Sequence, residues 1–182
     1  ESAGDVLVLI SDGEGGFGMA QQIHVGANPV SITAGDFDGD GYTDIAVACA
    51  ADNAVSILSN LATGDGSFDA SWSFGVGNNP RDVEAVNLNN DSAMDLVVAA
   101  SDDDVVEMWL SQMNFHGGGF GNDGGIPVGD NPVDIDPGDV TNPKDFDVFM
   151  SVANYDEKST TVIKGTTALV GSWLTETIEV GE

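Results

Sequence analysis

Short runs of apolar and β-branched residues, separated by Gly, Asn and Asp, recur along the whole chain, and none shows a helical period of 3.6. In one stretch they are PVSITAG at 29–35, DIAVACA at 44–50, AVSILSN at 54–60 and ASWSFGV at 70–76. We interpret these runs as four short strands. The run at 44–50 is apolar at successive positions, which is typical of a strand buried on both faces.

The strand pattern belongs to a tandem repeat. VGANPVSI begins at Val25, VGNNPRDV at Val76, VGDNPVDI at Val128 and VGE at Val180, so the spacings are 51, 52 and 52 residues. Further positions keep this register, namely Asp44, Asp95 and Asp147, and Phe17, Phe68 and Phe120. The sequence therefore predicts one domain made of a half repeat at 1–24, repeats at 25–75, 76–127 and 128–179, and the start of another at 180–182.

Four antiparallel strands in a unit of this length are typical of a β-propeller blade, so the predicted fold class is all-β. The second strands of the later repeats, DLVVAAS and DVFMSVA, are again apolar on both faces. This is typical of a strand between two neighbouring blades, and their small Ala residues suit the crowded inner part of a ring.

The half repeat predicts an incomplete ring. VLVLIS at 6–11 aligns with AVSILS at 54–59, so residues 1–24 correspond to the two outer strands of a blade without the two inner ones. Three and a half units cannot close a ring, which usually needs at least four blades. We expect an open arc or part of a larger propeller. Its strand edges would pair with other copies, forming a homo-oligomer or filament, or with further repeats of a longer chain.

An acidic loop, GDFDGDGYTD at 35–44, precedes the second strand. Asp36, Asp38 and Asp40 alternate along the chain, Gly41 permits a sharp turn, and Asp44 follows. Six to eight oxygen ligands are what Ca²⁺ requires, and we expect the side chains of these four Asp residues and a carbonyl near Tyr42 to supply them. The loop is not an EF-hand, because its twelfth residue is Val47 in place of Glu. The alternative is an Asp/Gly-rich turn without metal.

The later loops carry fewer carboxylates. The second repeat has Asn87, Asn89, Asp91 and Asp95, in which two amides replace carboxylates, so we expect weaker calcium binding there. In the third repeat Asp139 and Asp147 remain, but Thr141, Pro143 and Lys144 take the intervening positions. We expect that loop to hold no metal.

The order VGxNP, GDFDGDGYTDIAVA, AVSIL and GDGSF resembles the FG-GAP/VCBS-type repeats of bacteria, relatives of the blades in the integrin α-subunit head. GEGGFG at 13–18 and GGGFGN at 117–122 carry the Phe-Gly element, whereas GDGSFD at 64–69 keeps only the Phe. The resemblance implies a β-propeller with calcium in loops between strands. It also implies a secreted or cell-surface protein concerned with adhesion or ligand binding.

Charge favours cations as partners. The chain has 31 acidic and 4 basic residues and a net charge of −27, which argues against nucleic acid and anionic membranes. The chain contains no apolar run of ~18 residues, so the sequence predicts no membrane-spanning helix. Calcium loops of extracellular modules bind with Kd near ~10⁻⁴–10⁻³ M, so we expect these to be filled outside the cell and to act structurally.

Other candidate residues predict no catalytic chemistry. His24 and His116 lack a second ligand at metal spacing, Cys49 reads as a small buried hydrophobe, and the run Asp102, Asp103 and Asp104 reads as a solvated turn. We expect packing roles between blades for Trp72, Trp109 and Trp173. No nucleophile elbow or P-loop appears, so we do not expect an enzyme.

Two functions fit the sequence. The first is an extracellular calcium-binding module for adhesion, matrix formation or self-assembly. The second is a lectin-like module that binds glycans or a protein as a discrete species. Dependence of assembly on calcium and concentration would favour the first, and retention on a glycan array the second.

Overall fold

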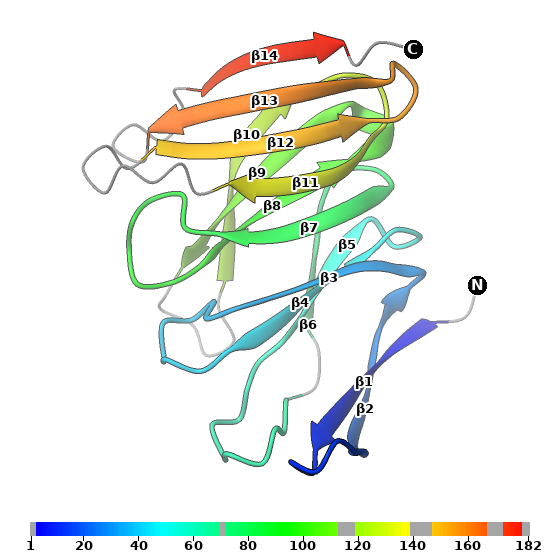
Figure 1. The fold of residues 1–182 in the computed structure, drawn as a ribbon, viewed down its shortest axis with the longest axis vertical. Coiled ribbons are helices and arrows are strands. Elements are labelled where there is room, and N and C mark those ends of the chain that lie inside the picture. The colour runs from blue at the N-terminus through cyan, green and yellow to red at the C-terminus, as the bar shows by residue number, and fades with distance from the viewer. Residues whose placement is uncertain (1–2, 70–71, 113–118, 139–146, 167–172, 180–182) are drawn as a thin grey trace.

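The computed structural model describes residues 3–69, 72–112, 119–138, 147–166 and 173–179, which form one two-stranded and three four-stranded antiparallel sheets (Figure 1). The half-blade consists of β1 (Ala3–Ser11) and β2 (Phe17–Ala27). Blade 1 consists of β3 (Pro29–Gly35), β4 (Asp44–Cys49), β5 (Ala54–Leu58) and β6 (Trp72–Gly75). Blade 2 consists of β7 (Pro80–Val86), β8 (Asp95–Ala100), β9 (Val105–Gln112) and β10 (Gly119–Pro127), with a 3₁₀ turn η1 (Ser101–Asp103) after β8. Blade 3 consists of β11 (Pro132–Gly138), β12 (Asp147–Asn154), β13 (Ser159–Thr166) and β14 (Trp173–Glu179).

The predicted fold class is confirmed. Within every blade the strands pair in chain order, and the four strands predicted between residues 29 and 76 are β3 to β6. The sheets stack in chain order into an open arc, with the half-blade at one end and β14 at the other (Figure 1). None of the helical segments in the described parts of the chain has the length and apolarity needed to cross a membrane.

The core lies between the sheets. One apolar cluster joins the half-blade to blade 1, a second joins blades 1 and 2, and a third joins blades 2 and 3. Strand β4 contributes to two of them, because Ala46 and Ala48 face blade 2 while Val47 and Cys49 face the half-blade. Cys49 is buried with a free thiol, as expected from the sequence.

Aromatic side chains fill the junction between blades 1 and 2. Phe74 lies 4.9 Å from Trp109 and 5.2 Å from Phe120 between ring centroids, and Trp72 lies 5.8 Å from Phe74. The packing roles predicted for Trp72 and Trp109 are confirmed. The side chain of Trp173 lies outside the described residues.

The register of the half-blade corrects the sequence alignment by one residue. Val6 pairs with Ile23 and Val55 pairs with Phe74, and Ile23 and Phe74 are one repeat of 51 residues apart. Val6 therefore corresponds to Val55, and the alignment of VLVLIS with AVSILS was wrong. A one-residue slip exchanges the two faces of a strand, so Val6 packs on the core while Leu7 is 56% exposed.

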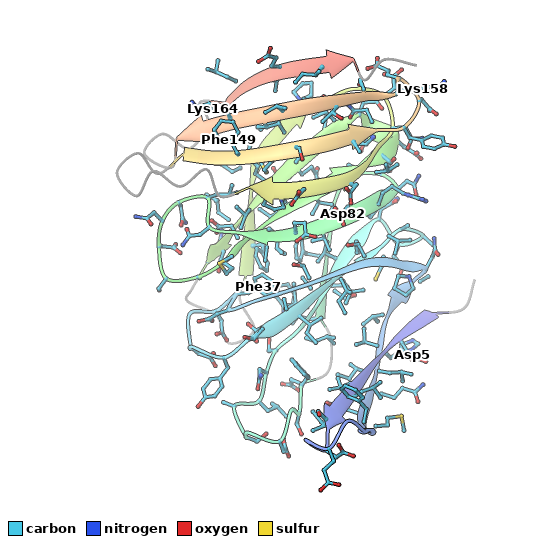
Figure 2. The ribbon with its side chains drawn as sticks, viewed as in Figure 1. Asp5, Phe37, Asp82, Phe149, Lys158 and Lys164 are labelled. Carbon is cyan, nitrogen blue, oxygen red and sulfur yellow. The ribbon has the colours of Figure 1, made fainter. Side chains whose placement is uncertain are left out.

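The first strands of the three blades lie side by side and are joined through side chains. Ser31 Oγ on β3 donates to Asp82 Oδ1 on β7 at 2.6 Å, and Ile135 N on β11 donates to Asp82 Oδ2 at 2.7 Å. Asp82 is labelled in Figure 2 and lies on the middle blade. Burial, followed by the negative charge of Asp82, raises the pKa of Glu84 on the same strand.

Candidate metal site

The predicted first metal loop gathers three carboxylates between β3 and β4. One oxygen from each of Asp36, Asp38 and Asp40 lies within 4.8 Å of the others. Two oxygens bound to one Ca²⁺ can be separated by up to ~5 Å, twice the usual Ca–O distance. The three side chains are therefore close enough to share one calcium ion. They are the one such group of acidic, His or Cys side chains among the residues that the structure describes.

Backbone amides orient these carboxylates. Gly39 N and Gly41 N donate to the two oxygens of Asp36 at 2.8 and 2.9 Å, and Asp40 N donates to Asp38 Oδ1 at 3.1 Å. Gly39 and Gly41 have φ values of +77° and +89°, a left-handed conformation that favours glycine. The amide dipoles offset part of the repulsion among the carboxylates and hold them in one arrangement.

The same loop is tied to the next blade. Phe37, between two of the clustered Asp residues, is fully buried (labelled in Figure 2). Its ring meets that of Phe120 edge to face at 5.8 Å between centroids. Met94 N donates to the carbonyl of Asp36 at 2.7 Å, and Ser111 Oγ donates to the carbonyl of Phe37 at 2.5 Å. The backbone of the acidic loop therefore forms part of the junction between blades 1 and 2.

Asp44 is buried and fixes the backbone of the acidic loop; we call Asp44, Phe37 and the hydrogen bonds of the Asp44 carboxylate the buried frame of the loop. Its Oδ2 accepts from Phe37 N at 3.0 Å and its Oδ1 from Asn60 N at 2.8 Å, so it joins the loop to the end of β5. Burial raises the pKa of Asp44 to about 6, and the negative charges of Asp38 and Asp40 add to the rise. The group within 4.8 Å does not include Asp44. The ligand roles of Asp44 and of the Tyr42 carbonyl stay predictions.

The second loop reproduces the frame. Asp95 accepts from Leu88 N and from Ser111 N, each at 2.8 Å, at the same offsets of 7 residues before and 16 after as in the first loop. Burial raises the pKa of Asp95 to about 6. Ser111 joins the two loops, because its amide bonds Asp95 while its hydroxyl bonds the carbonyl of Phe37.

The polar side chains of the second loop form hydrogen bonds within the loop itself. Asn87 Nδ2 donates to the carbonyl of Asp91, and Asn89 Nδ2 donates to Asp91 Oδ2, both at 2.8 Å. The remaining oxygen, Asn87 Oδ1, is buried and has no hydrogen-bond partner in the described part of the chain. Asn87 occupies the repeat position of Asp36, so this oxygen is available to a cation. Calcium binding by Asn87, Asn89, Asp91 and Asp95 stays a prediction.

The third loop cannot be compared in this way. Residues 139–146 and the side chain of Asp147 lie outside the described residues, as does His116. His24 lies on the half-blade, where its Nδ1 is 3.0 Å from Asp5 Oδ1. Hydrogen bonds from His24 and then Gln22 lower the pKa of Asp5.

The sequence prediction identified Asp44 and Asp95 but missed their structural task. Each carboxylate accepts two backbone hydrogen bonds that join a loop to a strand end. The signal was present, because both Asp residues keep their repeat register. The run Asp102–Asp104 also does more than form a solvated turn. Asn78 N donates to Asp103 and Asn131 N to Asp104, so the run supports the loops that lead into β7 and β11.

Comparison with known families agrees with this architecture. A family model described as FG-GAP-like repeat matches residues 2–47 and 36–98, more than half of the chain. The first match runs from the half-blade into β4, the second runs from the acidic loop through β4, β5 and β6 into β8, and both contain residues 36–44. No curated protein matches the chain.

Proposed function

The chain belongs to the FG-GAP-like repeat family, and from this premise we propose that it is a calcium-stabilised β-propeller-type module that works outside the cell in adhesion, matrix formation or self-assembly. The observation that carries the proposal is the group of three carboxylates in a loop that is bonded to the next blade. An ion in that loop would strengthen a junction between blades as well as a turn.

Calcium would be held first by Asp36, Asp38 and Asp40, with Asp44 and the Tyr42 carbonyl as the further predicted ligands. The second loop would use Asn87, Asn89, Asp91 and Asp95. A ligand that binds only the folded state stabilises it by RT ln(1 + [L]/Kd), about 1.4 kcal/mol at ten times Kd. With the weak affinity of extracellular loops, this requires calcium near the millimolar range, as outside cells.

The ends of the arc support assembly between copies. On the half-blade, Leu7 and Leu9 are 56% and 55% exposed, and β1 pairs only with β2 among the described strands. At the other end, Leu174 and Ile178 of β14 are also exposed. Because these two surfaces differ, a contact between them is head-to-tail, which extends into a filament unless the rotation closes it. A net charge of −27 opposes such contacts, and bound calcium would reduce the repulsion.

The test is sedimentation velocity of the full chain at several concentrations, in calcium and in EGTA. We expect large species in calcium that dissociate in EGTA and that the variant Asp38→Ala/Asp40→Ala does not form. We expect Leu7→Ser/Leu9→Ser to remain monomeric in calcium. Leu61→Ser is the matched control, because Leu61 is an exposed leucine in the loop after β5.

Two results would count against separate parts of the proposal. Thermal stability that does not change with calcium in the wild type and in Asp38→Ala/Asp40→Ala would remove the calcium site. If Leu7→Ser/Leu9→Ser assembles to the same extent as Leu61→Ser, the half-blade surface is not the contact between copies.

A further inference from the structure

Arg81 is the single arginine in a chain with 31 acidic residues. It lies near the start of β7 and is exposed. Among the described residues it forms no ion pair or hydrogen bond. A guanidinium has five N–H donors in a fixed planar arrangement, so Arg81 retains its full capacity to bind a ligand.

Strands β7 and β11 begin side by side (Figure 1). Arg81 lines a cavity of about 240 Å³ at this place. Asn79 and Asn131, which line it, form two backbone corners, with φ values of +51° and +57° directly before the prolines that start these strands. The cavity is lined by Asn79, Arg81, Asp102, Asn131, Val133 and Tyr155. We call it the Arg81 pocket.

Bonds inside the protein occupy only part of the polar lining. Asn79 Nδ2 donates to Asp102 Oδ1 at 3.0 Å, which positions both side chains. The side chain of Asn131 also bonds inside the protein, because its amide nitrogen donates to Asp156 and its oxygen accepts from Ser101 Oγ. The groups that remain for a ligand are the Arg81 guanidinium, the second oxygen of Asp102, the amide oxygen of Asn79 and Tyr155.

The three chemically distinctive residues of the pocket depart from the repeat. The carbonyls of Ala27 and Asn78 accept from Ala51 N and Asp102 N, so Ala51 is the counterpart of Asp102. In the same way the carbonyls of Asn79 and Asn131 accept from Ser101 N and Tyr155 N, so Ser101 is the counterpart of Tyr155. Arg81 itself corresponds to Val30 and Val133 in the 51- and 52-residue register.

The pocket residues that the fold requires differ from the pocket residues that carry distinctive polar groups. Around the junction between blades 1 and 2, Ala51 N and Ser101 N form the same backbone bonds as Asp102 N and Tyr155 N, and Val30 stands in the place of Arg81, so these bonds do not require Asp or Tyr. The asparagines that form the corners repeat, whereas a cation, a carboxylate and an aromatic ring appear together around one cavity.

We infer that the Arg81 pocket binds one neutral pyranose residue of a glycan. The Arg81 fork can donate to two adjacent hydroxyls, while the oxygens of Asp102 and Asn79 accept hydroxyl protons. Tyr155 is 71% exposed and offers an apolar ring for the C–H face of a sugar. The cavity is below the ~300 Å³ lower end of drug-sized pockets, so it suits a single ring.

Charge selects a neutral sugar over an acidic one. A carboxylate in the pocket would approach Asp102 as well as Arg81, in a chain with a net charge of −27. The site uses neither the acidic loops nor the end faces of the arc, so it is independent of the function proposed above.

The test is a titration of the full chain with the methyl glycosides of glucose, galactose, mannose and fucose, followed by amide chemical shifts in NMR. At least one glycoside should shift the amides of Asn79, Arg81 and Tyr155 with a saturable curve. Arg81→Val and Tyr155→Ser, which install the repeat residues of the other junction, should each weaken that binding by tenfold or more. Lys164→Ala is the control, because it removes a cation on β13 whose Nζ lies 5.2 Å above the Phe149 ring, outside the pocket lining (Figure 2).

Three results would overturn the inference. The first is that none of the four glycosides shifts these amides at millimolar concentration. The second is that the two pocket variants bind the glycoside as tightly as the wild type does. The third is tighter binding of methyl glucuronide than of methyl glucoside, which would contradict the neutral class. Sedimentation of Arg81→Val should match the wild type, so failure of this site and failure of calcium-held assembly give different data.

Discussion

The loops at 36–44 and 87–95 have the same buried frame and different polar side chains. In both, a large apolar residue enters the core, Phe37 or Leu88, and an Asp that begins the next strand bonds the amide of that residue. The first loop adds three clustered carboxylates, whereas the second replaces two of them with amides that bond Asp91. The frame is what the fold needs, and the other polar positions can vary without disturbing it.

The difference predicts unequal dependence on calcium. In the first loop, repulsion among three carboxylates is relieved only in part by backbone amides, so a cation gives the largest gain there. In the second loop, two hydrogen bonds between Asn89 and Asp91 already satisfy part of the polar groups. Calcium should therefore stabilise the first loop more than the second.

Removal of the buried apolar residue should have the largest effect. We expect Phe37→Ala to lower the free energy of unfolding by about 3–5 kcal/mol and Leu88→Ala by about 2–5 kcal/mol, because each leaves a cavity between blades. Urea unfolding in calcium-free buffer measures both. Phe17→Ala is the control, since Phe17 is largely exposed, and its effect should stay within about 1 kcal/mol. A loss at Phe37 as small as that at Phe17 would contradict its place in the core.

Removal of the shared Asp should come next. Asp95→Ala leaves the amides of Leu88 and Ser111 without an acceptor, and we expect a loss of roughly 2–4 kcal/mol. Asp44→Ala should cost a similar amount if the two frames are equivalent. Asp65→Ala, in an exposed turn, is the matched control and should cost less than about 1 kcal/mol. A difference of several kcal/mol between Asp44→Ala and Asp95→Ala would break the comparison.

The pH dependence of stability should report on the same two carboxyls. Burial raises the pKa of Asp44 and Asp95 from 3.8 to about 6, so the folded chain keeps two protons that the unfolded chain has already lost. Their contribution is complete below the unfolded pKa and is lost as pH rises through the folded pKa. Metal-free protein should therefore lose stability between about pH 4 and pH 6. The change should be smaller in Asp44→Ala or Asp95→Ala, and an equal change in wild type and variants would contradict the assignment.

Calcium should distinguish the loops by a smaller amount. At about ten times Kd we expect calcium to stabilise the wild type by about 1.4 kcal/mol per filled site. Asp38→Ala should abolish the calcium stabilisation that comes from the first loop. Asp91→Ala should abolish the smaller calcium stabilisation that comes from the second loop. Thermal unfolding with and without calcium provides the measurement, with Asp65→Ala as the control for loss of one negative charge. A larger loss in Asp91→Ala than in Asp38→Ala would reverse the predicted order.

Conversion of the second loop should give the smallest effect. Asn87→Asp/Asn89→Asp restores the carboxylates of the first loop, so we expect stronger calcium binding with a gain below about 1.4 kcal/mol in calcium. Without calcium the same variant should be less stable than the wild type, because it loses two amide donors to Asp91. Isothermal titration calorimetry should show tighter or additional binding. Unchanged binding would mean that the second loop is not a metal site.

Most of the fold was predictable from the sequence because each strand depends on a few adjacent residues and the same pattern occurs in three repeats. The runs at 29–35 and 44–50 needed only β-type residues and turn residues at their ends, and three repeats confirmed each other. The packing of Trp72 and Trp109 followed from the same register. The prediction for the half-blade failed by one residue because the repeat spacing is not kept between its two strands: Val6 and Ile23 are 17 residues apart, whereas their counterparts Val55 and Phe74 are 19 apart.

Local sequence thus determined the repeat length, the strands, the all-β class and the place of the acidic loop, since alternation and turn formation act over a few residues. The tertiary structure determined which face of β1 is exposed, that Asp44 and Asp95 join loops to strand ends, and that Arg81, Asp102 and Tyr155 share one cavity. These features depend on hydrogen bonds and packing between residues that are far apart in the chain. No pattern in a single run of residues specifies such contacts, because the neighbouring blade supplies the other half of each one.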